Sequence, residues 1–322
     1  MLRFAAFPLL LTLLVPLAAQ VPDEQAPVIK VDVNIVNVLC SVRDKHGAYV
    51  ANLIKDDFAI FEDGKPQTIR YFNRENDLAL TIGLLVDVSG SQERLIGVER
   101  EAAIQFFAAV LGKKDMAFLI SFGSEAELLQ DYTNSHRLMR DALDKLRVNA
   151  AVTGLHPGPV PTISQPRGTV LFDAVYLATT DRLKGEVGRK AVVLITDGVD
   201  QGSRLKLQDA LMAAQKADTV IYSIYYVDPS AYGSRGSWGF GPSDSDLRKM
   251  SEDTGGRLFR TGRRNSLDEA FRQLQEELRN QYAIGYTPLS EAKNSGFRKI
   301  EIRMRDKEWK VQARKGYFPV TP

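Results

Sequence analysis

The sequence contains very little cysteine, histidine and tryptophan, with one, three and two residues respectively among 322. Because Cys40 is the single cysteine, no internal disulfide can form, and the fold has to be stabilised by its hydrophobic core. An excess of charge of one sign is also absent, since 42 basic and 40 acidic residues leave a formal net charge of +2. Dense clusters of lysine and arginine do not occur either. The sequence therefore lacks the electrostatic footprint of nucleic-acid binding, and we expect no nucleic-acid partner.

Long hydrophobic runs are confined to the start of the chain. Arg3 precedes an apolar stretch at residues 4–17, and small residues follow it, which is the pattern of a secretory signal peptide. The stretch is shorter than a bilayer span usually needs, and two prolines interrupt it. We therefore expect a signal peptide at residues 1–19 and export to the periplasm, the envelope or the medium, with no transmembrane segment after its removal. An uncleaved amino-terminal anchor is the alternative.

The residues after this segment form a β-rich zone. A polar leader at residues 20–27 precedes residues 28–77, where apolar side chains recur at every second position. The alternation changes phase between Ile35 and Val36, which predicts a β-bulge. The sequence Glu-Asp-Gly-Lys at 62–65 is a hairpin signal. The strands expected around it are short and cover residues 49–53, 58–61 and 68–72.

The middle zone, residues 78–280, alternates between two patterns. Continuous apolar runs are typical of strands that are covered on both faces, and they lie at residues 81–86, 116–122, 191–195 and 219–227. Helical spacing between them marks residues 95–111, 138–146 and 207–214, and a capping box begins a last helix at Ser266. This alternation predicts an α/β fold, namely a doubly wound, mostly parallel sheet flanked by helices on both sides.

The last zone, residues 281–322, is rich in β-strand patterns again. Its strands and those of residues 28–77 are too few to form separate cores, and the ends of an α/β domain often lie close together. We therefore expect both ends to build one immunoglobulin-like β-sandwich into which the α/β domain is inserted. Two separate β modules would leave the same pattern in the sequence.

Oxygen-bearing side chains follow two of the expected strands. Asp87 ends the first apolar run, Ser89 and Ser91 follow at alternate positions, and Asp197 comes after the run at 191–195 and one threonine. Ligands of doubly wound sheets bind at the carboxyl ends of the strands, so these side chains are expected to converge. Carboxylates and hydroxyls suit a hard cation such as Mg²⁺, Ca²⁺ or Mn²⁺. Few negative charges would neutralise that cation, which could then accept a carboxylate from outside.

The segment Asp87-Val88-Ser89-Gly90-Ser91 resembles the D-x-S-x-S signature of the von Willebrand factor type A family, whose metal-ion-dependent adhesion site begins with it. Thr169 and Asp197 match the other two positions of the family's site, in order. The resemblance implies a Rossmann-like fold in which Ser89, Ser91 and Thr169 contact the metal. It also implies that Asp87 and Asp197 hold the metal's waters or bind it closely. A protein partner would supply an Asp or Glu carboxylate to the remaining coordination position.

The resemblance continues outside the central zone. The residues at 42–47 and 57–64 are similar to the region that precedes the type A domain in an exported bacterial subgroup, described mainly in acidobacteria. Tyr-Thr-Pro at 286–288 and Arg-Lys-Gly-Tyr at 314–317 resemble the carboxy-terminal motifs of that subgroup.

Other readings of the same residues remain open. Asp87 and Asp197 could be purely structural helix-capping residues, and the chain could be an envelope scaffold that binds partners without metal. Asp173 and Asp200 lie near the expected ligands in sequence and could support them from behind, or could act only as helix or loop acids. A metal-dependent hydrolase or phosphatase is disfavoured, because no histidine neighbours Ser89 in sequence and no G-x-S-x-G elbow is present. We therefore expect a binding module and not an enzyme.

Overall fold

The computed structural model describes residues 35–74, 78–148, 168–228, 242–262, 266–289 and 296–319. All of them belong to one compact unit, Asn34–Pro322. The expected signal peptide, the leader and the strand residues before Ile35 lie outside the described residues. Within the described ranges, every helix is too short or too polar to cross a bilayer.

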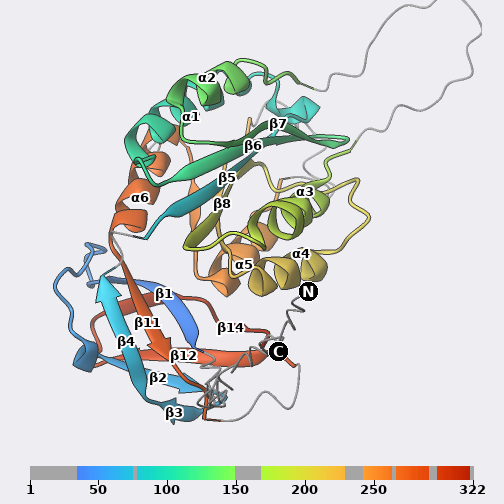
Figure 1. Ribbon diagram of the computed structural model, residues 1–322. Helices are drawn as coiled ribbons and strands as arrows, with labels where there is room; N and C mark the ends of the chain where they lie inside the picture. The colour runs from blue at the N-terminus through green and yellow to red at the C-terminus, as the bar shows by residue number, and fades with distance from the viewer. Residues whose placement is uncertain are drawn as a thin grey trace, which may run out of the picture. The chain divides into compact units, whose positions relative to one another are not determined.

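A six-stranded sheet forms the centre of the α/β unit, which runs from β5 to α6 (Figure 1). Its strand order is β10-β9-β8-β5-β6-β7, and every neighbouring pair is parallel except β6 with β7. The strands are β5 (Leu80–Asp87), β6 (Met116–Phe122), β7 (Ala126–Thr133), β8 (Arg189–Thr196), β9 (Val220–Tyr225) and β10 (Leu258–Arg260). Every residue of β5 and β8 is buried, as the continuous apolar runs predict.

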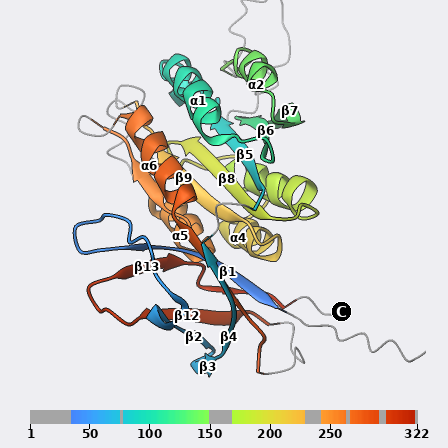
Figure 2. The same cartoon turned by 60° about the vertical axis from the view of Figure 1, so that its left-hand side comes forward.

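Helices cover both faces of this sheet, so the prediction of a doubly wound, mostly parallel α/β architecture is confirmed (Figure 2). One face packs against α1 (Ile96–Val110), α2 (His136–Leu143) and α6 (Leu267–Arg279). The other packs against α3 (Leu171–Leu177) with its π-helical continuation η3 (Ala178–Leu183), α4 (Leu207–Lys216) and α5 (Ser245–Thr254). Ser266 begins α6 as expected, because its hydroxyl accepts a hydrogen bond from the Glu269 amide.

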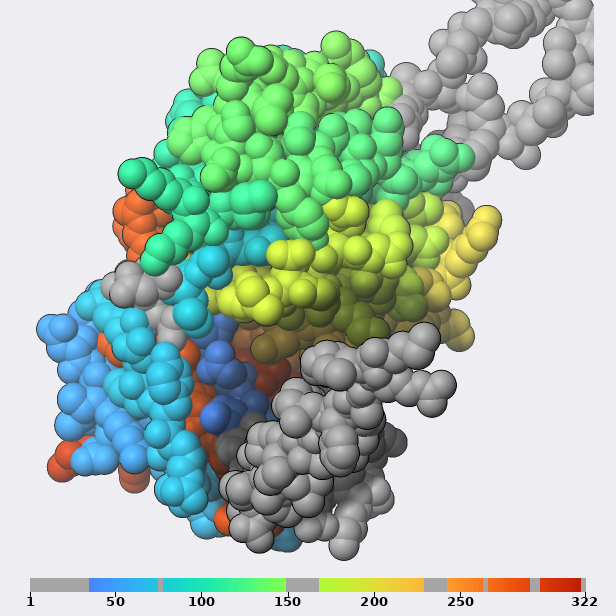
Figure 3. Space-filling view, viewed as in Figure 1, coloured from blue at the N-terminus to red at the C-terminus, as the bar shows by residue number. Residues whose placement is uncertain are grey.

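The remaining strands form two four-stranded sheets, β13-β1-β11-β4 and β14-β12-β2-β3, which we call the β unit. Its strands are β1 (Val36–Arg43), β2 (Phe58–Glu62), β3 (Lys65–Gln67), β4 (Ile69–Arg74), β11 (Gln281–Tyr286), β12 (Arg298–Met304), β13 (Lys310–Ala313) and β14 (Gly316–Tyr317). Strands from both ends of the chain occur in each sheet, and blue and orange-red atoms adjoin in the β unit of Figure 3. The two sheets share one hydrophobic core, in which Cys40 is buried.

Two details of the β unit differ from expectation. The predicted strand at 49–53 is wrong, since only a single bridge joins Arg43 to Tyr49, and Asn52 has a left-handed backbone with φ 67° that interrupts any extended run. The hairpin after β2 is confirmed, with Asp63 and Gly64 at φ 48° and 78°. The returning strand, however, changes sheets after three residues, so that β3 pairs with β2 whereas β4 pairs with β11.

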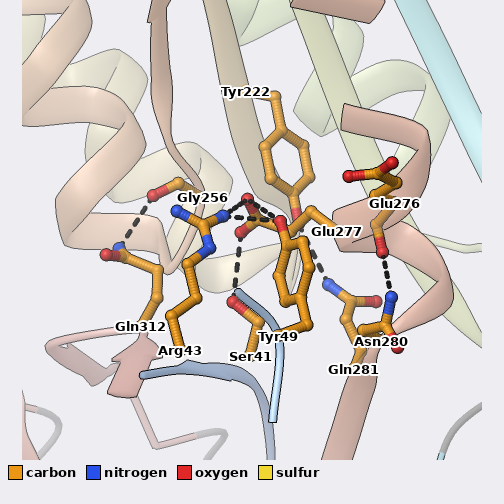
Figure 4. A network of polar contacts seen from close by, with 10 residues as sticks. All are labelled: Ser41, Arg43, Tyr49, Tyr222, Gly256, Glu276, Glu277, Asn280, Gln281 and Gln312. Carbon is orange, nitrogen blue, oxygen red and sulfur yellow. Dashed lines mark hydrogen bonds and ion pairs between the residues drawn. The ribbon is translucent and has the colours of Figure 1, made fainter. Parts of the chain in front are cut away.

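Helix α6 leads directly into β11, and a buried polar network surrounds this junction (Figure 4). The Glu277 carboxylate accepts hydrogen bonds from Arg43 at 2.6 Å, from the Tyr49 hydroxyl at 3.2 Å and from Ser41 at 3.3 Å. Burial raises the pKa of Glu277, and Arg43 opposes that rise. Each of these three donors comes from the β unit, so α6 is tied to it by a compensated charge.

Candidate metal centre

Asp87 is the last residue of β5 and is completely buried. Its Oδ1 accepts a hydrogen bond from the Ser89 amide at 2.9 Å, which turns the chain away from the strand. Its Oδ2 accepts the hydroxyl proton of Thr196 at 2.6 Å, across the sheet at the end of β8. The carboxylate is thus fixed from two neighbouring strands, because parallel strands end at the same edge of the sheet.

The two serines lie on and beside a short 3-10 turn, η2 (Gly90–Gln92). The hydroxyl oxygens of Ser89 and Ser91 are 3.0 Å apart, and Ser91 donates a hydrogen bond to Asp197 Oδ2 at 2.6 Å. Asp197 is 1% exposed and follows β8 directly. A hydrogen-bonded row therefore joins three of the five predicted positions, and the Ser89 amide connects Asp87 to the same row.

Gly198 permits the turn that follows Asp197. Its φ is +78°, and an added Cβ would lie 2.1 Å from the carbonyl oxygen of Ser243. A side chain at this position would therefore collide with the backbone as well as strain its own. The Val199 amide then donates to Asp197 Oδ1 at 3.1 Å, which closes the turn.

Thr169 is 5% exposed and lies between two loops at the same edge of the sheet. Its carbonyl accepts a hydrogen bond from the Gln201 amide at 3.1 Å, and the next amide, of Val170, donates to the Gly123 carbonyl at 2.8 Å. The loops involved follow β8 and β6. Across the ranges that the structure describes, the Thr169 side chain has no hydrogen bond to the other four predicted positions.

Asp200 and Asp173 hold the backbone around Thr169. Asp200 Oδ1 accepts hydrogen bonds from the Leu171 amide at 3.0 Å and from the Ser203 hydroxyl at 2.5 Å, and so caps the first turn of α3. The Asp173 carboxylate accepts from the amides of residues 204 and 205, in the loop before α4. These are the helix and loop roles that the sequence left open, and the Asp200 bond fixes the segment carrying Thr169.

Sequence reasoning missed two buried polar residues near this row. The Gln92 amide Nε2 donates to Asp197 Oδ2 at 3.1 Å. Glu99, on the buried face of α1, is 0% exposed. The sequence does contain a signal for Glu99. It lies three and four residues before Ala102 and Ala103, so helical spacing places this acid on the same face as the apolar residues of α1.

The electrostatics of the row favour a cation. Burial, followed by the charge of Asp197, raises the pKa of Asp87 from its ordinary value of 3.8 to about 7. Burial also raises the pKa of Glu99, and the charges of Asp87 and Asp197 raise it further. The influences that lower the pKa of Asp87 are hydrogen bonds from Ser89 and Thr196 and not a basic side chain. The Asp87 carboxylate is therefore held by hydrogen bonds and has no basic partner among the described residues.

The donor set matches hard divalent cations, which prefer oxygen ligands. It combines two carboxylates with the hydroxyls of Ser89, Ser91 and Thr169 at one edge of the sheet. Among the described residues, no three acidic, histidine or cysteine side chains are arranged to hold a metal together.

No family model and no curated protein matches the chain. Similar solved structures include the conserved hypothetical protein BatB from Bacteroides thetaiotaomicron, at 15% identity and a TM-score of 0.44 over 62% of this chain and 97% of that one. Another is a von Willebrand factor type A protein from Catenulispora acidiphila, at 12% identity and a TM-score of 0.47 over 80% of this chain and 71% of that one. A third is proximal thread matrix protein 1 from the mussel byssus with a zinc-occupied MIDAS motif, at 17% identity and a TM-score of 0.46 over 66% of this chain and 48% of that one. The likeness to the exported bacterial subgroup stays a prediction.

Proposed function

We propose that this protein is an exported binding module that captures a carboxylate of a protein partner through a divalent cation. The observation that carries the proposal is the row of Asp87, Ser89, Ser91 and Asp197 at the carboxyl edge of the sheet, where the buried Asp87 carboxylate has no basic partner among the described residues. A cation is the natural counter-charge for such a cluster, because an uncompensated carboxylate in a low-dielectric environment is costly.

We assign direct contact with the cation to Ser89, Ser91 and Thr169. Asp87 and Asp197 would bind it closely or through its waters, and Asp200 and Asp173 would hold the loop that carries Thr169. Hydroxyl ligands are neutral, so the cation would retain much of its positive charge. This favours a further oxygen ligand with a negative charge, such as an Asp or Glu side chain of the partner.

Mg²⁺ is the cation that we favour, with Ca²⁺ or Mn²⁺ as alternatives of the same hard class. We infer binding and not catalysis, because none of the described hydrogen bonds of Ser89 or Ser91 involves a histidine. We further infer that the two sheets of the β unit form an immunoglobulin-like sandwich that carries the α/β unit as an insertion. Support comes from the strand order, which mixes both ends of the chain in each sheet.

Isothermal titration with Mg²⁺, Ca²⁺ and Mn²⁺ tests the cation site. The wild-type chain should bind at least one of them, and Asp87→Ala should abolish the signal. A matched control is Asp141→Ala, which removes an exposed acid of α2 far along the chain from the row and should bind as the wild type does. Equal binding by wild type and Asp87→Ala would contradict the site.

A pull-down from an envelope extract, with and without EDTA, tests the partner. A protein that is retained with Mg²⁺ and released by EDTA is the expected result. Retention that is unchanged by EDTA and by Asp87→Ala would instead identify a scaffold that binds without metal.

A further inference from the structure

Buried polar atoms without a hydrogen-bond partner are concentrated beside the metal centre. Among the described residues there are six such side-chain atoms, and three of them belong to Gln92 and Glu99. An unsatisfied buried polar group costs about 1–3 kcal/mol, and more when it is charged. Folded proteins keep few of these groups, so a cluster of three at one place requires a functional explanation.

Gln92 contacts Asp197 of the row through its side-chain amide nitrogen. Nε2 donates to Asp197 Oδ2 at 3.1 Å and to the carbonyl oxygen of Tyr226 at 3.4 Å. Tyr226 is held in turn by its own amide, which donates to the Thr196 carbonyl at 3.0 Å. Both neighbours of Nε2 are acceptors, which fixes the orientation of the amide. The Asp197 carboxylate is therefore oriented by a buried donor, while Gln92 Oε1 has no partner.

Glu99 is the second residue with buried polar atoms that lack a partner. It is 0% exposed, and both of its carboxyl oxygens lack a partner among the described residues. Electrostatic interactions connect it to Asp87 and Asp197, and its charge also acts on Tyr226. Since no three acidic groups of the described chain are arranged to hold a metal together, Glu99 is not a third carboxylate ligand. Glu99 lies within range of the charges of Asp87 and Asp197.

We propose that Gln92 and Glu99 form a buried polar layer that increases the affinity of the centre for its cation and lowers the stability of the cation-free protein. This inference rests on the proposed function. Gln92 acts as a positioning residue for Asp197, as groups behind a metal ligand commonly do. Glu99 is a buried carboxyl group without a hydrogen-bond partner among the described residues, and a bound divalent cation would favour its ionised form.

Two variants test the layer, each with two measurements. Gln92→Met keeps the length of the side chain and removes the donor, and Glu99→Gln removes the charge. For both we expect the Mg²⁺ affinity to fall by about ten- to hundredfold. For Glu99→Gln, the melting temperature in EDTA should stay the same or rise, because a buried ionisable group without a partner has been replaced by a neutral one. A residue with a merely structural role would lower that temperature.

Matched controls are available elsewhere in the described chain. Gln215→Met replaces a buried glutamine of α4, and Glu277→Gln replaces a buried acid that has its own arginine. The first should change neither measurement, and the second should lower the melting temperature without changing the Mg²⁺ affinity.

The outcomes separate this inference from the proposed function. A wild-type chain that binds no cation would refute the proposed function. Binding that is lost in Asp87→Ala but weakened less than about fivefold in Gln92→Met and Glu99→Gln would overturn the polar layer alone. A fall in the melting temperature of Glu99→Gln in EDTA would also overturn it, because Glu99 would then stabilise the fold directly.

Discussion

Lowering the pH should release the cation, because a proton competes with it for Asp87. The pKa of Asp87 is raised to about 7 by burial and by Asp197. At pH 5 the carboxyl group is two units below that pKa, so roughly one cation-free molecule in a hundred carries the ionised form. Metal ligands must be deprotonated to bind. The apparent affinity for Mg²⁺ should therefore be about a hundredfold lower at pH 5 than above pH 8.

The stability of the cation-free protein should change in the opposite direction. The folded-state pKa of Asp87 is raised above its ordinary value of 3.8, so the folded protein holds this proton more tightly than the unfolded chain does. The resulting stabilisation is complete below pH 3.8 and is lost as the pH rises through about 7. A difference of about three units corresponds to ~4 kcal/mol. With Mg²⁺ bound, the carboxylate is ionised in both the folded and the unfolded chain over this window, so its contribution to stability should no longer change with pH.

Isothermal titration between pH 5 and pH 8.5, in buffers with different ionisation enthalpies, measures both the affinity and the protons released. Close to one proton per cation should leave Asp87 at pH 5, and almost none above pH 8. Asp87→Asn should bind poorly at every pH. An affinity that changes by less than about threefold between pH 5 and pH 8, or binding without proton release at pH 5, would refute the reasoning.

Three substitutions test other parts of the structure. Thr196→Val removes the 2.6 Å hydrogen bond that lowers the pKa of Asp87, so the midpoint of the pH titration should rise by about one unit. Arg43→Met leaves the buried Glu277 carboxylate without its arginine partner. It should lower the free energy of unfolding, measured by urea titration, by about 3–5 kcal/mol and leave the Mg²⁺ affinity unchanged. Gly198→Ala, at φ +78° and 2.1 Å from a carbonyl oxygen, should cost about 1–3 kcal/mol of unfolding free energy and weaken Mg²⁺ binding.

The sequence predicts the strands of the sheet centre and the edge at which the site lies. Continuous apolar runs identify β5 and β8, and the acids that end them, Asp87 and Asp197, fall at one edge because the two strands are parallel. The edge strand β7 escapes prediction, since its side chains are mostly half-exposed or exposed and leave no continuous apolar run. Helix α5 also escapes prediction, because Leu247 and Met250 are its only apolar residues, and α3 does so because its apolar residues are nearly continuous and show no helical spacing.

Burial of polar residues depends on tertiary packing and cannot be derived from spacing alone. Gln92 follows the signature directly, and nothing in the sequence indicates that its amide contacts Asp197. The contacts of Asp200 and Asp173 cannot be predicted from the sequence either, because their partners are backbone amides about 30 residues away along the chain. Predicting these contacts requires knowing which loops meet at the edge of the sheet.

Buried acids elsewhere in the described chain differ from Asp87 and Glu99 in having basic partners. Glu62 is 2% exposed, and it pairs with Arg298 at 2.7 Å and accepts hydrogen bonds from two tyrosine hydroxyls. Glu277 is similarly surrounded by an arginine, a tyrosine and a serine. The fold thus provides a basic partner where a buried acid is structural. Asp87 and Glu99 have no ion pair with a basic side chain anywhere in the described ranges, which is the arrangement expected where the counter-charge comes from outside the chain.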